Sequence, residues 1–471
     1  MYTYVHMRIN VQLYEAGTST NSFCCCKERS SSMKQGTGVV GELCKDVFIP
    51  KMVKVHQKFD LSYIKPEDIP GVVRAQLDRD IIASKIKPGM TIAITCGSRG
   101  VSNTALIIKT IASYVKEKGA KPFVFPAMGS HGGATPEGQT QIVNGYGVVE
   151  DYVGCPIRAT METKQIGTTD DGRPVFIDKY AAESDGIIML GRIKAHTQFV
   201  GPYESGLMKM AVIGMGKQHG AEGVHEQGFV HMAENIQRYG KVILKNAPII
   251  CGVGLLENAA DQTHTIVALT PDEIIEQEPE YLKKAKALMG HIMIKHADLL
   301  IIDEIGKNIS GDGHDPNVSN MLPRETGVPF GPNGEFPSKC EFNADRKIVL
   351  DLTEETHGNA NGLGLADVTT QRCVDKIVNA AAYPNAVTST ILEMVKIPFW
   401  TENDKLAIQV ALKTATKADK TAPKIVRIKN TMEVQDIYVS EALLPEVEAN
   451  PDMEVAGELA PMPFDENGNL F

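Results

Sequence analysis

Three features are scarce or missing in this chain, and each absence excludes a class of protein. Nine cysteines among 471 residues are too few for a disulfide scaffold, and six of them are spread singly, which is typical of a reducing compartment. The net charge of -10 leaves no basic footprint for nucleic acid or an anionic membrane. No apolar run approaches the roughly 20 residues of a bilayer span. We therefore expect a cytoplasmic protein that binds neither nucleic acid nor membrane.

The first 50 residues carry no sign of a folded element. Residues 18–41 are rich in serine, threonine, lysine and glycine and follow neither a helical nor a strand period. No apolar stretch of about 7–15 residues precedes a cleavage site, as it would in a signal peptide. Cys24, Cys25 and Cys26 are adjacent and so lack the C-x-x-C spacing of a zinc or redox site. We expect residues 1–50 to form a disordered extension.

From residue 87 onward, short β-branched runs alternate with amphipathic helical stretches. The predicted strands are 91–96, 121–126, 186–190, 248–252, 298–303 and 347–352, and the predicted helices include 104–118, 226–238, 273–289 and 370–382. This alternation is typical of α/β architecture with mostly parallel sheets. At about 150 residues per domain the length indicates more than one domain. We predict an N-terminal catalytic and cofactor-binding α/β domain over 51–270, a C-terminal α/β domain over 271–471, and an active site in the cleft between them.

Polar residues with chemical potential follow the predicted strands. In parallel α/β sheets, ligands bind beyond the carboxyl ends of the strands, in the loops that lead to the helices. The loops in question contain Ser98, Arg99, His131, His196 and Lys307. We expect these side chains to face a common cleft.

The two histidines each have an ordinary alternative to a role in catalysis. His131 is flanked by glycines, so the backbone there can approach a ligand closely, but it could also be a turn histidine that points to solvent. His196 could be a packed histidine whose ring is satisfied by a backbone carbonyl. The histidine spacing in the chain does not match H-E-x-x-H, so a zinc hydrolase of that type is not expected.

Lys209 lies in an apolar run punctuated by glycines. Burial lowers the pKa of a lysine and makes its amine a nucleophile that can hold a covalent adduct; a lysine that snorkels to solvent is the alternative. The run is not a nucleotide-binding P-loop, because Ala211 replaces the first glycine and Gln218 replaces the magnesium-binding Ser or Thr. Glu257 likewise stands where the third glycine of a dinucleotide fingerprint belongs.

Four motifs together resemble the nickel-pincer-nucleotide-dependent lactate racemase family. They are GSHGGATPEGQ at 129–139, KAHT at 194–197, SGLMK at 205–209 and MGKQHGAEGVH at 215–225. The resemblance extends over roughly residues 52–440. In that family, a lysine carries a pyridinium-3-thioamide-5-thiocarboxylate mononucleotide that binds Ni²⁺, and one histidine completes the coordination. The resemblance implies that Lys209 is the covalent attachment point and that His225, sixteen positions later, is the nickel ligand, with His219 as the fallback.

The same resemblance implies roles for the residues of the expected cleft. His131 and His196 correspond to two acid–base histidines. Ser98 and Arg99 correspond to cofactor-binding positions, and Arg99 together with Lys307 would hold the carboxylate of the substrate. The implied activity is racemisation or epimerisation of a 2-hydroxy acid by hydride transfer to the lysine-bound nucleotide, and a homodimer is the default assembly.

The chain departs from the family pattern at three places near the implied site. Cys96 stands where the family has an acidic residue before the arginine, the loop through 202–204 is slightly longer, and the flanks of Lys307 differ. The substrate therefore need not be lactate. Two alternatives stay open: an epimerase of a sugar acid on the same cofactor, and a non-catalytic ligand-binding or sensor homologue of the same fold.

Overall fold

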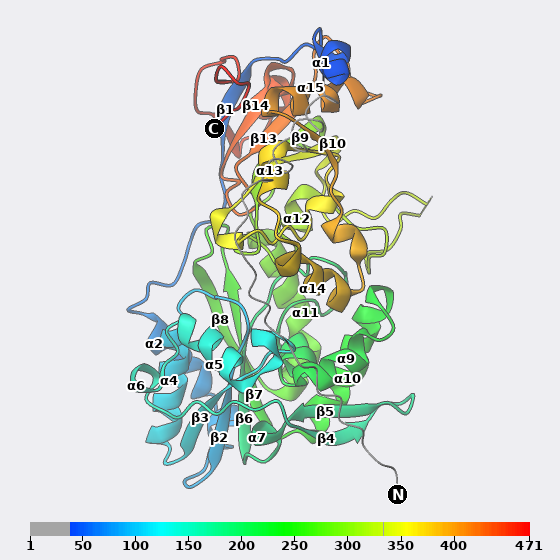
Figure 1. Ribbon diagram of the computed structural model, residues 1–471. Helices are drawn as coiled ribbons and strands as arrows, with labels where there is room; N and C mark the ends of the chain where they lie inside the picture. Colours follow the sequence, from blue (N-terminus) through cyan, green and yellow to red (C-terminus); the bar gives the residue numbers. More distant parts are fainter. Residues whose placement is uncertain (1–37, 333) are drawn as a thin grey trace, which may run out of the picture. The chain divides into compact units, whose positions relative to one another are not determined.

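The computed structural model describes residues 38–332 and 334–471. The disordered extension expected over 1–50 therefore lies outside the described residues as far as residue 37, and beyond that point helix α1 spans Gly38–Cys44. The chain divides into two units. The second unit, Val47–Phe471, contains two large β-sheets and all the elements described below (Figure 1).

The first sheet contains the four strands that the sequence pattern predicts in the N-terminal half, together with a fifth strand that the pattern does not predict. Its order is β3-β2-β6-β7-β8. The bounds are β2 (Thr91–Cys96), β3 (Lys121–Pro126), β6 (Gly186–Arg192), β7 (Ile249–Glu257) and β8 (Thr263–Leu269). The first four strands are parallel, and β8 is antiparallel to β7. Continuous apolar runs suit these strands because helices cover both faces of the sheet.

Strand β2 illustrates how the two faces are filled. Ile92 and Ile94 are buried in one core with helices α2 (Ile69–Leu77) and α4 (Thr104–Glu117). Ala93, between them, belongs to the core on the opposite face, which includes α10 (Met232–Asn246). Since alternate side chains of a strand point to opposite faces, every residue of the run has an apolar environment.

The second sheet draws its strands from both ends of the unit. Its order is β12-β11-β10-β9-β13-β14-β1-β15. The bounds are β1 (Met52–Gln57), β9 (His296–Ile305), β10 (Asn343–Leu352), β11 (Val368–Thr370), β12 (Phe399–Thr401), β13 (Ile425–Ile428), β14 (Asp436–Ser440) and β15 (Met453–Val455). Strands β12 to β13 in this order are parallel, and the remaining pairs are antiparallel. Strand β1 lies inside the range predicted for the N-terminal domain, 51–270, but it pairs with β14 and β15 of the second sheet.

The remaining elements connect or cover these sheets. Strands β4 (Thr163–Thr168) and β5 (Pro174–Asp178) form a separate antiparallel pair. The other helices and helical turns are α3 (Asp80–Ala83), η2 (Gly132–Ala134), α5 (Pro136–Gly145), α6 (Glu150–Val153), α7 (Lys179–Ala182), α8 (Leu207–Lys209), η3 (Met210–Gly214), α9 (Lys217–His225), η4 (Phe229–His231), α11 (Pro271–Leu288), α12 (Pro316–Ser319), η5 (Glu354–Thr356), η6 (Leu363–Leu365), α13 (Gln371–Asp375), α14 (Asn379–Ser389), η7 (Leu392–Val395), α15 (Asp404–Thr414), η8 (Glu441–Leu443) and α16 (Leu444–Ala449). The predicted α/β architecture is confirmed.

Two predicted helices differ from the observed ones. The helix expected over 226–238 begins only at Met232, because Gly228 takes a positive φ of 75° and a short helical turn follows it. The helix expected over 370–382 is divided into α13 and α14. Between them Val378 is extended and donates its backbone N–H to the carbonyl of Gly358 at 2.9 Å. A glycine with a positive φ delays the start of the first helix, and a hydrogen bond between residues distant in the sequence divides the second. The helical periodicity of the sequence indicates neither.

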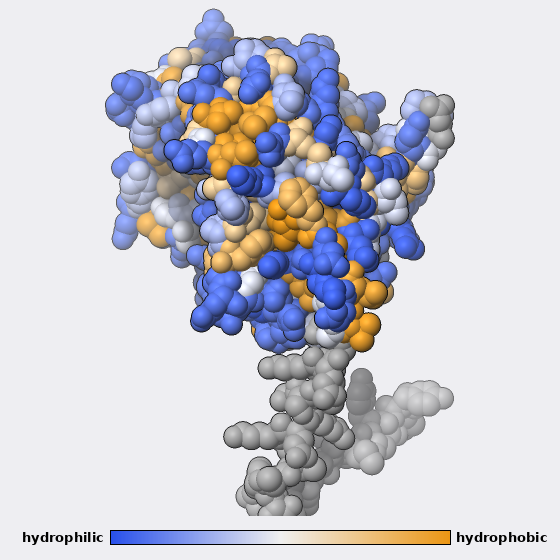
Figure 2. All heavy atoms as spheres, turned by 90° about the horizontal axis from the view of Figure 1, so that it is seen from above, coloured by the Kyte–Doolittle hydropathy of each residue, from blue (hydrophilic) through white to orange (hydrophobic). Residues whose placement is uncertain are grey.

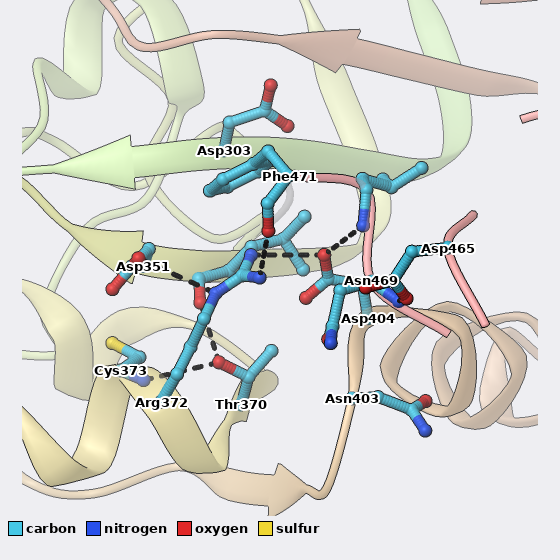
Figure 3. A network of polar contacts seen from close by, with 12 residues as sticks. Asp303, Asp351, Thr370, Arg372, Cys373, Asn403, Asp404, Asp465, Asn469 and Phe471 are labelled. Carbon is cyan, nitrogen blue, oxygen red and sulfur yellow. Dashed lines mark hydrogen bonds and ion pairs between the residues drawn. The ribbon is translucent and has the colours of Figure 1, made fainter. Parts of the chain in front are cut away.

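A polar network surrounds Arg372 of α13, beside the second sheet (Figure 3). Its guanidinium donates to Asp404 Oδ2 at 3.0 Å and to the carbonyl oxygen of Phe471 at 2.9 Å. Its Nε lies 3.5 Å from a carboxylate oxygen of Asp351. The Asp404 side chain is fully buried, and this burial raises the pKa of its carboxyl group. Arg372 therefore supplies the charge that a carboxylate at this buried position requires.

Replacing Arg372 by alanine should destabilise the fold by about 3 kcal/mol, because it leaves a buried carboxylate without its partner. Thermal or urea unfolding followed by circular dichroism measures the loss. The matched control is Arg74→Ala. Arg74 lies 2.6 Å from Glu117, with 37% and 57% of the two side chains exposed, and such pairs contribute less than about 1 kcal/mol. Equal losses in the two variants would contradict a special role of Arg372.

The molecular surface is dominated by polar side chains. The face drawn in Figure 2 is mostly hydrophilic, with apolar side chains gathered in separate patches. Exposed apolar residues include Val387 and Leu392, at 68% and 64%. Such residues are common on folded proteins and do not by themselves mark an interface. Among the described residues, no helix combines the length and the apolar character needed to cross a membrane.

Candidate active site

A cleft of about 670 Å³ lies beyond the carboxyl ends of β2, β3 and β6. The loops after these strands line it together with residues 307–311, which follow β9 of the second sheet. The predicted site residues in its lining are Ser98, Arg99, His131, His196, Lys209 and Lys307. Because parallel strands of one sheet end at the same edge, loops that are distant in the sequence meet here. The two candidate nickel ligands are not among the lining residues.

Lys209 ends helix α8, which continues directly into the π-helical turn η3. A buried carboxylate holds the start of this helix: Glu278 accepts the Met208 N–H at 2.9 Å. A side chain at Gly206 would collide with the same carboxylate. Burial, reinforced by the positive charge of Arg99, lowers the pKa of the Lys209 amine to about 8. A desolvated amine of this kind is a nucleophile close to neutral pH.

His131 lies in the glycine loop between β3 and α5. Gly132 and Gly133 have positive φ values of 64° and 66°, a region that favours glycine. The buried Gln139 holds the loop through its Nε2, which donates to the carbonyls of Gly129 at 2.9 Å and of His131 at 3.3 Å. Desolvation, followed by the positive charges of the cleft, lowers the pKa of the His131 imidazole to about 4. The ring is therefore neutral at pH 7 and able to accept a proton.

His196 follows β6 and is held through its backbone as well as its ring. Its N–H donates to Glu204 Oε2 at 2.7 Å, and its Nδ1 accepts the Gln198 N–H at 3.0 Å. The ring packs against Phe199, with centroids 4.3 Å apart. Desolvation, followed by the charge of Lys209, lowers its pKa well below the ordinary value. Because Nδ1 is an acceptor, the neutral ring carries its proton on Nε2 and can donate it to a ligand oxygen.

Two cations of the cleft are not held in a close ion pair. Among the residues that the structure describes, Arg99 and Lys307 form no salt bridge, although Asp312 is close enough to Lys307 to interact with its charge. Lys307 Nζ donates to the carbonyl of Gly311, and burial, followed by the charge of Arg99, lowers its pKa to about 8. Ser98 lies beside them, with its carbonyl accepting the Tyr146 hydroxyl at 2.8 Å. Unpaired cations at one site attract a carboxylate or a phosphate.

His225 lies at the end of α9 with one ring nitrogen occupied. Its Nδ1 is 2.9 Å from the carbonyl oxygen of Ala221, so Nδ1 donates and Nε2 keeps its lone pair. Its ring is 6.0 Å from that of Phe229, which is 6.5 Å from the ring of His196. Burial, followed by the charge of Lys209, lowers the pKa of His225. A neutral imidazole with one free nitrogen is the form in which histidine binds a metal.

His219, the fallback ligand, lies in a different setting. It is exposed, its Nδ1 is 3.0 Å from the Thr163 hydroxyl, and its ring packs against Phe176 of β5. These contacts direct the residue toward the β4–β5 pair. The surroundings therefore favour His225 over His219 as the candidate ligand.

Sequence reasoning missed a buried network that supports the His131 loop. The side chain of Lys217 is fully buried. Its amine donates to the Pro126 carbonyl at 2.8 Å and to the side-chain oxygen of Gln139, while Asp178 is 3.8 Å away. Gln139 in turn holds the His131 loop, so one lysine connects the start of the His225 helix with that loop. Lys217 lies within the MGKQHGAEGVH motif at 215–225, but the motif does not reveal its role, because its partners are distant in the sequence.

The sequence motifs also do not predict two ion pairs at the cleft. Arg192 pairs with Glu257 at 2.5 Å, and Lys194 pairs with Asp315 at 3.2 Å. All four residues line the cleft. The sequence gives a weak indication of the two cations, since Arg192 and Lys194 both lie shortly after the predicted strand 186–190. Their acidic partners come from β7 and from the segment after β9 and could not be paired with them from sequence.

Neutralising Lys209 should raise the pKa of His131, because the Lys209 ammonium is one of the charges that lower it to about 4. The test is an NMR titration of the histidine ring signals in wild-type and Lys209→Gln protein, with the His131 signal assigned from a His131→Asn variant. Lys307→Gln should act in the same direction. An unchanged His131 pKa would show that Lys209 is not close to it.

Comparison with known proteins shows that part of this chain is similar to a known domain. Residues 62–237 match the lactate racemase N-terminal domain, a segment that contains Ser98, Arg99, His131, His196 and Lys209. A solved structure of the lactate racemase apoprotein from Thermoanaerobacterium thermosaccharolyticum is similar at 13% identity and a TM-score of 0.44, over 81% of this chain and 99% of that chain. No curated protein matches the chain. Residues 62–237 are therefore similar to a lactate racemase N-terminal domain.

Proposed function

We propose that this protein is an isomerase that racemises or epimerises a 2-hydroxy acid with a nickel-pincer nucleotide bound to Lys209. One observation carries the proposal: within and beside a lactate racemase N-terminal domain, one cleft collects a desolvated lysine, two neutral histidines and two unpaired cations. Each type of group has a use in this chemistry. No other reaction class considered above needs the same combination.

The substrate carboxylate would bind to Arg99 and Lys307. Both are cationic donors, and charge-assisted hydrogen bonds to a carboxylate are strong and directional. With the carboxylate held, the hydroxyl group and C2 of the substrate are oriented toward the remaining side chains of the cleft. Fixed orientation of this kind lowers the entropic part of the barrier.

Proton transfer would fall to the two histidines. The hydrogen on C2 of a hydroxy carboxylate is a very weak acid, so its removal as a proton is difficult, whereas the hydroxyl proton can be passed to a neutral imidazole. His131 is neutral and accepts that proton. His196, with its proton on Nε2, donates a hydrogen bond to the same substrate oxygen from another direction. The proton held by His131 returns to this oxygen when the hydroxyl group of the opposite configuration is formed, so the site ends the turnover with both rings neutral.

The residues present are compatible with the implied cofactor. When bound, the nucleotide with its nickel supplies the acceptor and donor of the C2 hydride. Lys209 offers an amine with a lowered pKa for the covalent bond, and His225 offers a neutral imidazole with a free Nε2. Nickel accepts imidazole together with soft sulfur donors. These properties of the side chains, rather than any bound group, support the assignment.

The direct experiment loads the full chain in cells that also make the pincer nucleotide. Intact-protein and peptide mass spectrometry should locate the adduct on Lys209, and metal analysis should give about one nickel per chain. His225→Ala should keep the adduct and lose nickel, while His219→Ala should keep both. An unmodified, nickel-free protein from cells that load a known racemase would contradict the proposal and favour the non-catalytic sensor.

Sugar acids are the second substrate class to be tested. The two ion pairs Arg192–Glu257 and Lys194–Asp315 give part of the cleft wall a strongly polar character. Such a wall suits a substrate with further hydroxyl groups better than the methyl group of lactate. Comparing kcat/KM for lactate and for a six-carbon aldonate distinguishes the two classes: a higher value for lactate would contradict the sugar-acid alternative.

A further inference from the structure

We propose that Glu204 is a positioning residue that holds His196 in the cleft. The residue belongs to the loop of 202–204 that distinguishes this chain from the family pattern. Its role concerns the same site as the proposed function and rests on it.

The carboxylate of Glu204 binds the backbone of the histidine loop at two points. Oε2 accepts the N–H of His196 at 2.7 Å, and Oε1 accepts the N–H of Gly201 at 3.3 Å. The side chain is fully buried. Charge-assisted hydrogen bonds in a buried setting are stronger than those between neutral groups. One carboxylate thereby closes residues 196–204 into a compact loop.

Two lysines from outside the loop hold this carboxylate. Lys286 of α11 donates to Oε1 at 2.6 Å. Lys339 lies 3.7 Å from Oε2, and only 1% of its side chain is exposed. Lys339 also donates to the carbonyl of Phe199 at 3.0 Å. The two lysines therefore hold the Glu204 carboxylate from outside the loop and restrict where it can lie.

The opposite side of the loop is fastened to the second half of the chain. The carbonyl of Gln198 accepts the Thr326 hydroxyl and the Gly327 N–H, each at 2.9 Å. The Gln198 side chain donates to Asp312 Oδ2 at 2.7 Å. His196 is thus placed by Glu204 at its own peptide group and by Gln198 at its ring. Because a displacement of about 1 Å at a reacting group can cost about 100-fold in rate, loosening the Glu204 contact should be visible in turnover.

Hydrogen exchange tests the contact without relying on activity. In the apoprotein, Glu204→Ala should accelerate exchange of the His196 amide, measured by mass spectrometry on overlapping peptides across 194–201. Glu204→Gln keeps an oxygen that can accept this N–H, so it should retain most of the protection. A purely structural role predicts faster exchange throughout the chain instead. Faster exchange confined to this loop supports the proposal, and unchanged exchange in Glu204→Ala overturns it.

Kinetics of the loaded enzyme provide the second measurement. Glu204→Ala should lower kcat by about 10- to 100-fold and leave KM within about twofold, since Arg99 and Lys307 are untouched. Asp404→Asn is the matched control, because it removes a buried charge in the other sheet and should change neither kcat nor exchange at 194–201. A lower stability of Glu204→Ala with unchanged kcat would overturn the positioning role.

The two hypotheses fail in distinguishable ways. If wild-type protein carries no adduct and has no activity, the proposed function fails, while the exchange of the His196 amide still decides whether Glu204 holds this loop. If wild-type protein is active but Glu204→Ala exchanges and turns over normally, only the positioning role fails. Should Glu204→Ala not fold, Lys339→Met takes its place: it removes one of the two lysines that hold Glu204, and unchanged exchange across 194–201 would overturn the proposal.

Discussion

In the Lys209→Ala protein, the covalent adduct should disappear completely and racemisation should fall to the uncatalysed rate. The reason is the chemistry of attachment, which requires a neutral amine at this position. Lys209→Arg should fail in the same way, because arginine retains the positive charge but is not deprotonated in proteins. Intact mass and a chiral assay of the product measure the two effects. The melting temperature should not fall, because removing a desolvated ammonium group costs the folded state no buried partner.

Lys307 provides the matched control for this prediction. It lines the same cleft, and burial lowers its pKa to about 8, as it does for Lys209. Lys307→Ala should keep the adduct and raise KM by about 10-fold or more, the effect of losing one charge-assisted hydrogen bond to the substrate. If instead Lys307→Ala loses the adduct while Lys209→Ala keeps it, the nucleotide is attached to Lys307. The assignment of Lys209 would then be wrong.

Asparagine at either cleft histidine should slow turnover by about 10²- to 10⁴-fold, the usual contribution of acid–base catalysis. His131→Asn and His196→Asn are best measured as initial rates from each configuration of the substrate. Residues that act as a unit are not additive, so the double variant should be little slower than the slower single variant. His231→Asn, at the exposed start of α10, is the control and should turn over normally. A single variant that turns over within about twofold of wild type would remove that histidine from the mechanism.

An isotope experiment distinguishes a mechanism in which the histidines transfer only the hydroxyl proton from one in which a histidine removes the C2 hydrogen as a proton. If the histidines handle only the hydroxyl proton, the product formed in D₂O should keep its original hydrogen on C2. If a histidine removes that hydrogen as a proton, deuterium should enter at C2 in each turnover. The measurement is mass spectrometry of the product at low conversion. Deuterium at C2 would contradict the assigned roles of both histidines.

Much of the first sheet and of the cleft could be predicted because the determinants are local. Runs such as TIAITC at 91–96 are continuous and apolar, which is what a strand covered on both faces requires. A parallel sheet then places the loops after its strands at one edge, so Arg99, His131 and His196 come together without any knowledge of side-chain contacts. Their roles in catalysis stay predictions.

What could not be predicted depends on pairs that are distant in the sequence. Nothing in the residues near Glu204 indicates that Lys286 and Lys339 will surround its carboxylate. The buried position of Lys217 is equally invisible, since a lysine in a glycine-rich segment usually points to solvent. Local patterns report which face of an element is apolar, but they do not report which polar group lies opposite.

The pairing of β1 with β14 bears on how the chain folds during synthesis. His56 of β1 lies opposite Asp436 of β14, a separation of 380 residues. At about 5–20 residues per second, a ribosome needs roughly 20 to 80 seconds to make the missing partner. In the later part of that time, after β8 has been made, the first sheet has all its strands, while β1 is an unpaired edge able to join another chain. The nascent protein is therefore most vulnerable to aggregation after its cleft has begun to form and before the strand that pairs with β1 leaves the ribosome.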